Sequence, residues 1–167
     1  FGPMALAVHL SFQKLTDSDV SALVEYVRSV PPVATPDLPA PKLEPASDNP
    51  SHGILADTNP KGGDLFASMC AGCHGWSGVN DYVPHTTFTG TRPVNDPSAT
   101  NVALAVMHGS SPLLPAATNA IATMPAFGHT FTDEEIAAVS NYVIARFGAK
   151  PSAISAADVR KLREEAG

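Results

Sequence analysis

The chain has few cysteines, few positive charges and no long apolar run. Its two cysteines, Cys70 and Cys73, lie in one short motif, so they cannot form the disulfide framework of a small secreted protein. Ten Lys and Arg residues stand against 16 Asp and Glu, the net charge is −6, and no basic cluster is present, which argues against nucleic-acid binding. The longest apolar run, Val102 to Met107, is far shorter than the roughly 20 residues that span a membrane.

The residues that are present divide the chain by composition. Hydrophobic residues make up 44% and charged residues 16% of the 167 positions, which is typical of a globular protein. Residues 31–60 hold eight of the 16 prolines and have no helical period, and this predicts an extended, stiff linker. The linker separates residues 1–30 from a complete domain at residues 61–149, and a charged tail follows at residues 150–167.

The complete domain has apolar residues at helical spacing and no alternating strand pattern, so we expect an all-α fold of three main helices joined by long loops. The last helix has the clearest start, because Thr132 and Glu135 match the capping-box pattern. The second helix is expected to follow a cap at Ser98 or Thr100. The expected helices cover residues 64–73, 102–107 and 132–147, with one more short exposed helix at 155–165.

Residues 1–30 repeat features of that last helix. The segment Thr16 to Val20 aligns with Thr132 to Ile136, and the same register places Tyr26 on Tyr142. A methionine beside a proline precedes each helix, Met4 in one case and Met124 in the other. The first helix has an apolar face that needs a partner, formed by Val20, Leu23, Val24 and Val27. We expect residues 1–30 to be the C-terminal piece of a preceding, similar domain, and the chain to be a fragment of a longer protein.

The strongest chemical signal is the pentapeptide from Cys70 to His74, with the sequence C-A-G-C-H. Two thiols at this spacing near a helix end can each bond one vinyl group of the same porphyrin, and the imidazole of His74 then lies over the iron. A zinc site usually needs a second cysteine pair, a thioredoxin-type redox pair needs a strand–helix–strand setting, and a chance match is uncommon. The sequence therefore favours a c-type haem bound through Cys70, Cys73 and His74.

A second axial ligand is expected on the other face of the iron. Met124 is favoured, because Pro125 fixes the backbone of its loop and because His/Met ligation is usual for electron transfer. Met107 and Met69 lie within expected helices and are interpreted as core residues. The histidines are alternatives or surface residues: His108 and His129 are the alternative ligands, and His9, His52 and His85 are expected at the surface.

Other residues near the motif have two interpretations each. The stretch Tyr82-Val83-Pro84 either supplies a carbonyl for the second ring N–H of His74 or is a plain turn. Trp76 and Phe88 either wall the haem pocket or fill the core, and Arg92 either meets a haem propionate or is solvated.

Together these motifs resemble a class I cytochrome c domain. The resemblance rests on the pentapeptide Cys70 to His74, on Met124 to Gly128 (M-P-A-F-G) and on the final helix from Thr132 to Val143, and it covers residues 61–149. It implies a cytochrome c fold with a His/Met-ligated haem c that transfers electrons and is not itself an enzyme. The alternative is a haem peroxidase-type domain with a labile sixth ligand.

More narrowly, the chain is similar to the three-haem cytochrome c subunits of bacterial membrane-bound dehydrogenases that oxidise alcohols, aldehydes or sugars. Gly90 to Asn101, Ala157 to Leu162 and Phe1 to Met4 carry this narrower resemblance. It implies that Met4 is the axial methionine of a preceding haem. It also implies a periplasmic location at the inner membrane, with electrons passing from a flavin, quinoprotein or molybdenum subunit to ubiquinone or another respiratory acceptor.

Overall fold

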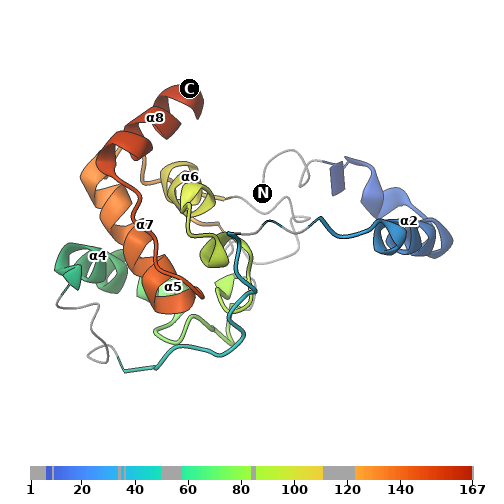
Figure 1. Cartoon of the computed structure of the whole chain (residues 1–167), viewed down its shortest axis with the longest axis horizontal. Helices are drawn as coiled ribbons and strands as arrows, with labels where there is room; N and C mark the ends of the chain where they lie inside the picture. Colours follow the sequence, from blue (N-terminus) through green and yellow to red (C-terminus); the bar gives the residue numbers. More distant parts are fainter. Residues whose placement is uncertain are drawn as a thin grey trace.

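The computed structural model describes residues 7–8, 10–33, 35, 37–49, 58–83, 86–110 and 123–166. The helical elements are α2 (Asp17–Ser29), α4 (Pro60–Leu65), α5 (Ala71–His74), α6 (Thr100–His108), α7 (Asp133–Phe147) and α8 (Ala156–Ala166), with short turns η1 (Phe12–Lys14), η2 (Phe66–Cys70) and η4 (Pro93–Asn95). Within the described ranges, the one β interaction is an isolated antiparallel bridge between Ser110 and Met124. The prediction of an all-α fold is confirmed. Figure 1 shows α4 to α8 gathered together and α2 apart from them.

The first helical segment of the larger unit is a continuous run of α4, η2 and α5. It begins earlier than predicted, at Pro60, because the side chain of Asn59 caps it by accepting the N–H of Gly62 at 3.0 Å. It ends at His74, followed by Gly75 with a φ of 70°. The middle of the run, η2, is a π turn, which the apolar pattern of the sequence does not predict.

Helices α4 and α7 cross closely, and this contact holds the first segment in place. The predicted capping box of α7 is confirmed, because Thr132 accepts the N–H of Glu135 and the Glu135 carboxylate accepts the N–H of Thr132. At the crossing, a Cβ on Gly62 would collide with the carbonyl oxygen of Ala138. Glycine at position 62 therefore permits the backbones to approach, and the Asn59 amide donates to the same carbonyl at 2.8 Å.

Helix α6 adds the third side of the core. Its buried residues include Val102, Val106 and Met107, which confirms Met107 as a core residue. The expectation that Ser98 or Thr100 is the N-cap is wrong. The N-cap is Ala99, which has a φ of 60°. The Ser98 hydroxyl accepts the N–H of Thr100 at 3.4 Å. A residue just before the N-cap thus provides a hydrogen-bond acceptor for the first turn of the helix.

Phe66 lies at the centre of an aromatic cluster and is fully buried. We call Phe66 and the four rings packed around it the Phe66 cluster: Trp76, Phe88, Tyr142 and Phe147, with centroids 5.4 to 6.5 Å from that of Phe66. Trp76 and Phe88 thus contribute to the core. The expectation that Met69 is a core residue is wrong, since its side chain is 49% exposed. A π turn carries more residues per turn than an α-helix, so Met69 is rotated away from the face on which Phe66 lies.

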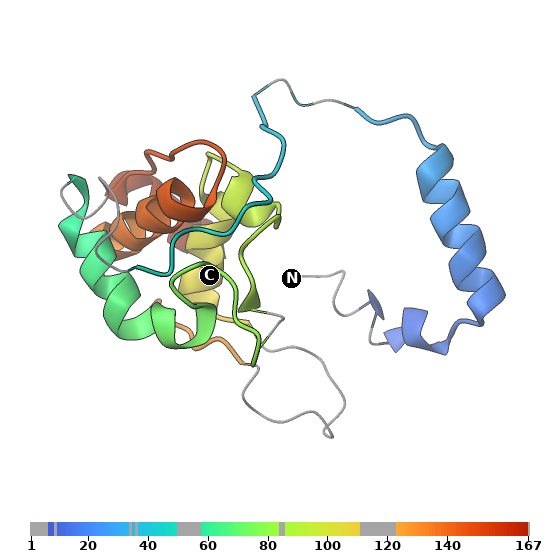
Figure 2. The same ribbon diagram turned by 90° about the horizontal axis from the view of Figure 1, so that it is seen from below.

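Residues 37–49, which we call the strap, run across the surface of the domain in extended form (Figure 2). Hydrogen bonds from its backbone hold the strap against the domain. Lys42 N donates to Asn95 Oδ1 at 2.8 Å, and Ala46 N donates to the Ser77 carbonyl at 2.9 Å. Arg92 is exposed and donates to the Pro39 carbonyl at 2.8 Å, so it is engaged with the strap. This part of the expected linker is therefore packed against the domain.

The expected tail helix forms as α8, but it is not simply exposed. Val159 is fully buried, and Arg163 donates to Asp133 Oδ1 at 3.0 Å and to the Gly128 carbonyl. Ser155 and Asp158 cap the start of the helix. The tail therefore packs against α7 and closes one end of the core.

Candidate functional site

The pentapeptide Cys70 to His74, which we call the attachment turn, consists of the last residue of η2 and the whole of α5. Cys70 is half-buried and packs against the hydrophobic core, whereas Cys73 is exposed. Both thiols are free. Gly72 lies between them, and a Cβ at that position would meet no atom within 4 Å. The turn thus carries one thiol packed against the core and one exposed thiol, separated by a glycine with free space around it.

The imidazole of His74 is fixed by one backbone hydrogen bond. Its Nδ1 lies 2.7 Å from the carbonyl oxygen of Thr86. A carbonyl only accepts, so Nδ1 carries the hydrogen and Nε2 keeps a free lone pair. The Thr86 hydroxyl in turn donates to the Cys73 carbonyl at 2.6 Å, and the Asn80 amide donates to the same oxygen at 2.9 Å. The loop after the attachment turn therefore holds the ring in an orientation suited to a metal ligand.

The carbonyl partner of His74 comes from a different residue of this loop than the sequence suggested. The candidate stretch was Tyr82-Val83-Pro84, but Thr86 supplies the oxygen. Tyr82 is exposed, and Pro84 lies outside the described residues. The Thr86 hydroxyl oxygen also lies 2.8 Å from the Val83 carbonyl oxygen, but the acceptor for His74 is the backbone carbonyl, which no side-chain pattern in the sequence identifies.

The surroundings of His74 favour the neutral ring. Phe88 stacks on the imidazole with centroids 4.1 Å apart and planes 12° apart. Burial lowers the pKa of His74, and the hydrogen bond to Thr86 partly opposes this effect. A neutral imidazole with a free Nε2 is the form that binds iron.

The environment of Cys70 argues against a redox-active dithiol. Burial raises the pKa of the Cys70 thiol to about 11, with a further contribution from the charge of Cys73. Reactive Cys-x-x-Cys motifs have a cysteine with a lowered pKa, whereas the pKa of Cys70 is raised. Among the residues that the structure describes, no three His, Cys, Asp or Glu side chains gather into a possible metal-ion site.

Met124 lies close to the C-terminal end of α6, where it pairs with Ser110. Its N–H and carbonyl form both hydrogen bonds of the bridge to Ser110, at 2.8 and 3.1 Å. Gly109, with a φ of 66°, permits this pairing, because a Cβ there would collide with the Met124 carbonyl. The Met124 side chain is half-buried against the same core as Cys70. The alternative ligands His108 and His129 are exposed.

The donor set fits a haem bound through two thioethers. One helical turn offers two free thiols and an imidazole with an available nitrogen, and a thioether from a different element packs against the same core. The assignment of Met124 as the sixth ligand stays a prediction. Met4, His9, His52 and His85 lie outside the described residues.

The sequence analysis missed Arg146, a buried residue beside the site. Its guanidinium donates to the Trp76 carbonyl, two residues beyond His74. Its position was a usable signal, because Arg146 follows Tyr142 and Val143 at the four- and three-residue spacing of the apolar face of α7.

The structure contains no membrane-spanning helix within its described ranges, since none of the helices there is both long and apolar enough.

Comparison with known proteins connects the chain to cytochrome subunits of dehydrogenases. It is 33% identical over 184 residues to the fructose dehydrogenase cytochrome subunit of Gluconobacter japonicus, an alignment that covers 97% of this chain and 36% of that protein. It is 32% identical over 171 residues to the alcohol dehydrogenase (quinone) cytochrome c subunit of Gluconacetobacter polyoxogenes, covering 98% and 35% respectively. For the gluconate 2-dehydrogenase cytochrome c subunit of Pantoea cypripedii the identity is 28% over 170 residues, with coverages of 99% and 37%.

The chain thus spans about a third of the length of these relatives. Each relative bears the name of a cytochrome subunit. Residues 57–143 match the family described as cytochrome c oxidase, cbb3-type, subunit III. The protein therefore belongs to this family of cytochrome c domains, which are all-α and carry electrons on a haem instead of catalysing a reaction of their own.

Proposed function

We propose that the chain transfers single electrons through one haem c, attached at Cys70 and Cys73 and ligated by His74 and Met124. The observation that supports this most directly is the 2.7 Å contact between His74 Nδ1 and the Thr86 carbonyl. It leaves Nε2 as the only ring nitrogen available to a metal, and it orients the ring on the same turn that presents the two thiols.

Each residue has a distinct role in this proposal. The two cysteines form thioether bonds, which retain the haem in a domain of modest size. His74 is the proximal ligand, and Phe88, stacked on it at 4.1 Å, restricts its rotation. Met124 would be the second ligand of the iron, and with both ligands in place no coordination position would be free for a substrate. When bound, the haem supplies a one-electron couple, and thioether ligation raises its reduction potential.

The relatives support a proposal for the physiological context. They are cytochrome subunits of fructose, alcohol and gluconate dehydrogenases, so we place this domain between a dehydrogenase catalytic subunit and ubiquinone or another respiratory acceptor. A periplasmic location at the inner membrane belongs to the same proposal. The catalytic subunit would be a flavin, quinoprotein or molybdenum protein.

We also propose that residues 1–30 close a preceding cytochrome c domain. Helices α2 and α7 share a capping box, formed by Thr16 and Asp19 in α2. In the common register Val20 and Leu23 correspond to Ile136 and Val139. The first two are each 43% exposed, and the last two are fully buried against the partners of α7. The apolar face of α2 thus has the residue pattern of a buried helix face. On this proposal the rest of the preceding domain covers it. On this proposal Met4, outside the described residues, ligates the preceding haem.

Absorption spectroscopy tests the ligand assignment. The chain matured with a cytochrome c assembly system should give a 6-coordinate low-spin spectrum that carbon monoxide does not change. Met124→Ala should open the iron and bind carbon monoxide readily, whereas His108→Ala, the matched control for the rival ligand, should behave as wild type. Ready carbon monoxide binding by the wild-type protein would contradict the proposal and favour the peroxidase-type alternative.

The intact mass of the full-length parent protein tests the second domain. Each covalent haem adds a fixed increment, so the mass counts the haems. A parent with a single haem would refute the assignment of residues 1–30 and of Met4.

A further inference from the structure

The guanidinium of Arg146 is buried, with only 7% of the residue exposed, and its acceptors are backbone carbonyls. Nε and Nη2 donate to the Trp76 oxygen at 3.1 and 2.9 Å, and Nη2 also donates to the Ser47 oxygen at 2.7 Å. The Asn49 oxygen lies 3.5 Å from Nη2. Arg146 therefore joins the end of α7 to two distant segments, the strap and the residues just after the attachment turn.

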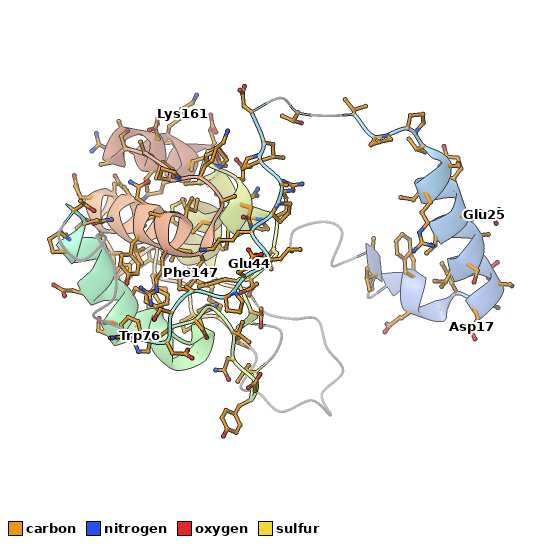
Figure 3. The ribbon with its side chains drawn as sticks, turned by 60° about the horizontal axis from the view of Figure 1, so that its bottom comes forward. Asp17, Glu25, Glu44, Trp76, Phe147 and Lys161 are labelled. Atoms are coloured by element: carbon orange, nitrogen blue, oxygen red, sulfur yellow. The ribbon has the colours of Figure 1, made fainter. Side chains whose placement is uncertain are left out.

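The charge of Arg146 is not neutralised by a carboxylate in the described part of the chain, where the ion pairs involve Lys61, Arg160, Lys161 and Arg163. Its guanidinium carbon instead lies 5.6 Å from the ring centroid of Trp76 and 5.5 Å from that of Phe147. Figure 3 shows these two rings on the side of the domain that the strap crosses, where Glu44 is labelled. Burying a cation without a counter-ion is costly, and the carbonyl acceptors and the two aromatic rings offset that cost here.

Arg146 is connected to the proximal histidine by two routes. Along the chain, the Trp76 carbonyl that it binds is two residues beyond His74. Through the aromatic rings, Phe147 lies 5.1 Å from Phe88, which stacks on His74 at 4.1 Å. The strap completes the arrangement, because the N–H of Ala46 donates to the carbonyl of Ser77, the residue after Trp76.

We infer that Arg146 is a positioning residue for the haem site: it clamps the strap onto the Trp76 carbonyl, and its buried charge raises the reduction potential of the haem. This inference rests on the proposed function. Ferric haem carries one more positive charge than ferrous haem, so a nearby cation disfavours the oxidised state. Water and salt screen a buried charge poorly, which makes the effect larger than that of a surface arginine. The clamp and the charge are separate contributions, and different substitutions remove them.

The test compares three variants of the haem-loaded chain. Arg146→Met removes both the charge and the donors and retains a long apolar side chain in their place. Arg146→Lys keeps the charge but cannot reproduce a forked guanidinium with donors to two carbonyls. Arg160→Gln is the matched control, because it removes an arginine charge from an exposed ion pair with Asp133. The readouts are the midpoint potential and the amide hydrogen exchange of Ala46.

Arg146→Met is expected to lower the midpoint potential and to speed exchange at Ala46 at least about tenfold, since charged hydrogen bonds contribute more than 1.4 kcal/mol each. Arg146→Lys should speed exchange similarly but leave the potential near that of wild type. Arg160→Gln should change neither. A folded Arg146→Met variant with an unchanged potential would overturn the electrostatic part of the inference.

An Arg146→Lys variant with wild-type exchange at Ala46 would overturn the clamp, and this measurement decides the matter even if the Met variant does not fold. Failure of the proposed function gives a different result. In that case the wild-type chain acquires no covalent haem and has no midpoint potential to measure, whereas the exchange experiment still reports on the strap.

Discussion

Replacing Gly62 with alanine tests the close crossing of α4 and α7. The added Cβ would overlap the Ala138 carbonyl oxygen and would lie 2.6 Å from Nδ2 of Asn59 and 2.9 Å from the Ala138 carbonyl carbon. The obstacle is mainly backbone, which cannot rotate away as a side chain can. Helix α4 must therefore move outward, or the Asn59 cap must give up its hydrogen bond to Ala138.

The expected destabilisation follows from three contributions. Overpacking at a tight contact costs about 1–3 kcal/mol. Loss of the hydrogen bond from Asn59 to Ala138 costs about 1 kcal/mol more. Against these losses, the higher helix propensity of alanine stabilises the folded state by at most about 1 kcal/mol. The net loss is about 2 kcal/mol, which corresponds to a fall in melting temperature of roughly 10 °C for a domain of this size.

Thermal unfolding followed by far-ultraviolet circular dichroism measures this difference. Gly63→Ala is the matched control on the same helix, because its Cβ would lie 3.3 Å from the edge of the Tyr142 ring, which can shift slightly. That variant should melt within a few degrees of wild type. A Gly62→Ala protein that melts at or above the wild-type temperature would refute the close crossing.

Three further predictions concern the polar and apolar ties of the domain. Asn95→Leu removes the acceptor of two backbone N–H groups, one of them that of Lys42, and should cost about 3 kcal/mol in urea unfolding. The hydrogen bond from the Thr132 N–H lowers the pKa of Glu135, so its stabilisation is complete above the ordinary value of 4.5 and is lost as the pH falls through the lower folded-state pKa. Melting temperatures measured down to about pH 3 should therefore fall more steeply for wild type than for Glu135→Gln. Val159→Ala should cost about 2 kcal/mol, whereas a tail helix without packing would show no change.

Local signals account for the features that the sequence predicted well. The capping box of Thr132 and Glu135 involves four consecutive positions, and the spacing of apolar residues set the faces of α6 and α7. Met107 was placed in the core because its neighbours on the helix are apolar. The attachment turn is also predictable from local sequence, because all of its reactive side chains lie within five consecutive residues.

Long-range polar contacts account for the features that it did not predict. The strap is held by bonds such as Lys42 N to Asn95 Oδ1, between residues of low hydrophobicity that are far apart in the chain. A proline-rich segment has the same composition whether it is solvated or packed, so its composition could not distinguish the two states. The carbonyl partner of His74 is a backbone group, and every residue carries one, so only the loop geometry selects Thr86.

The π turn at Phe66–Cys70 holds one residue more per turn than an α-helix does. Each residue of an α-helix advances the direction of the side chains by about 100° around the axis, so one extra residue in a regular helix would rotate the following thiols and imidazole by about that angle relative to Phe66. The π turn takes up the extra residue locally instead. A further insertion between Phe66 and Cys70 would not be absorbed in this way and would reorient the attachment turn relative to the buried ring of Phe66.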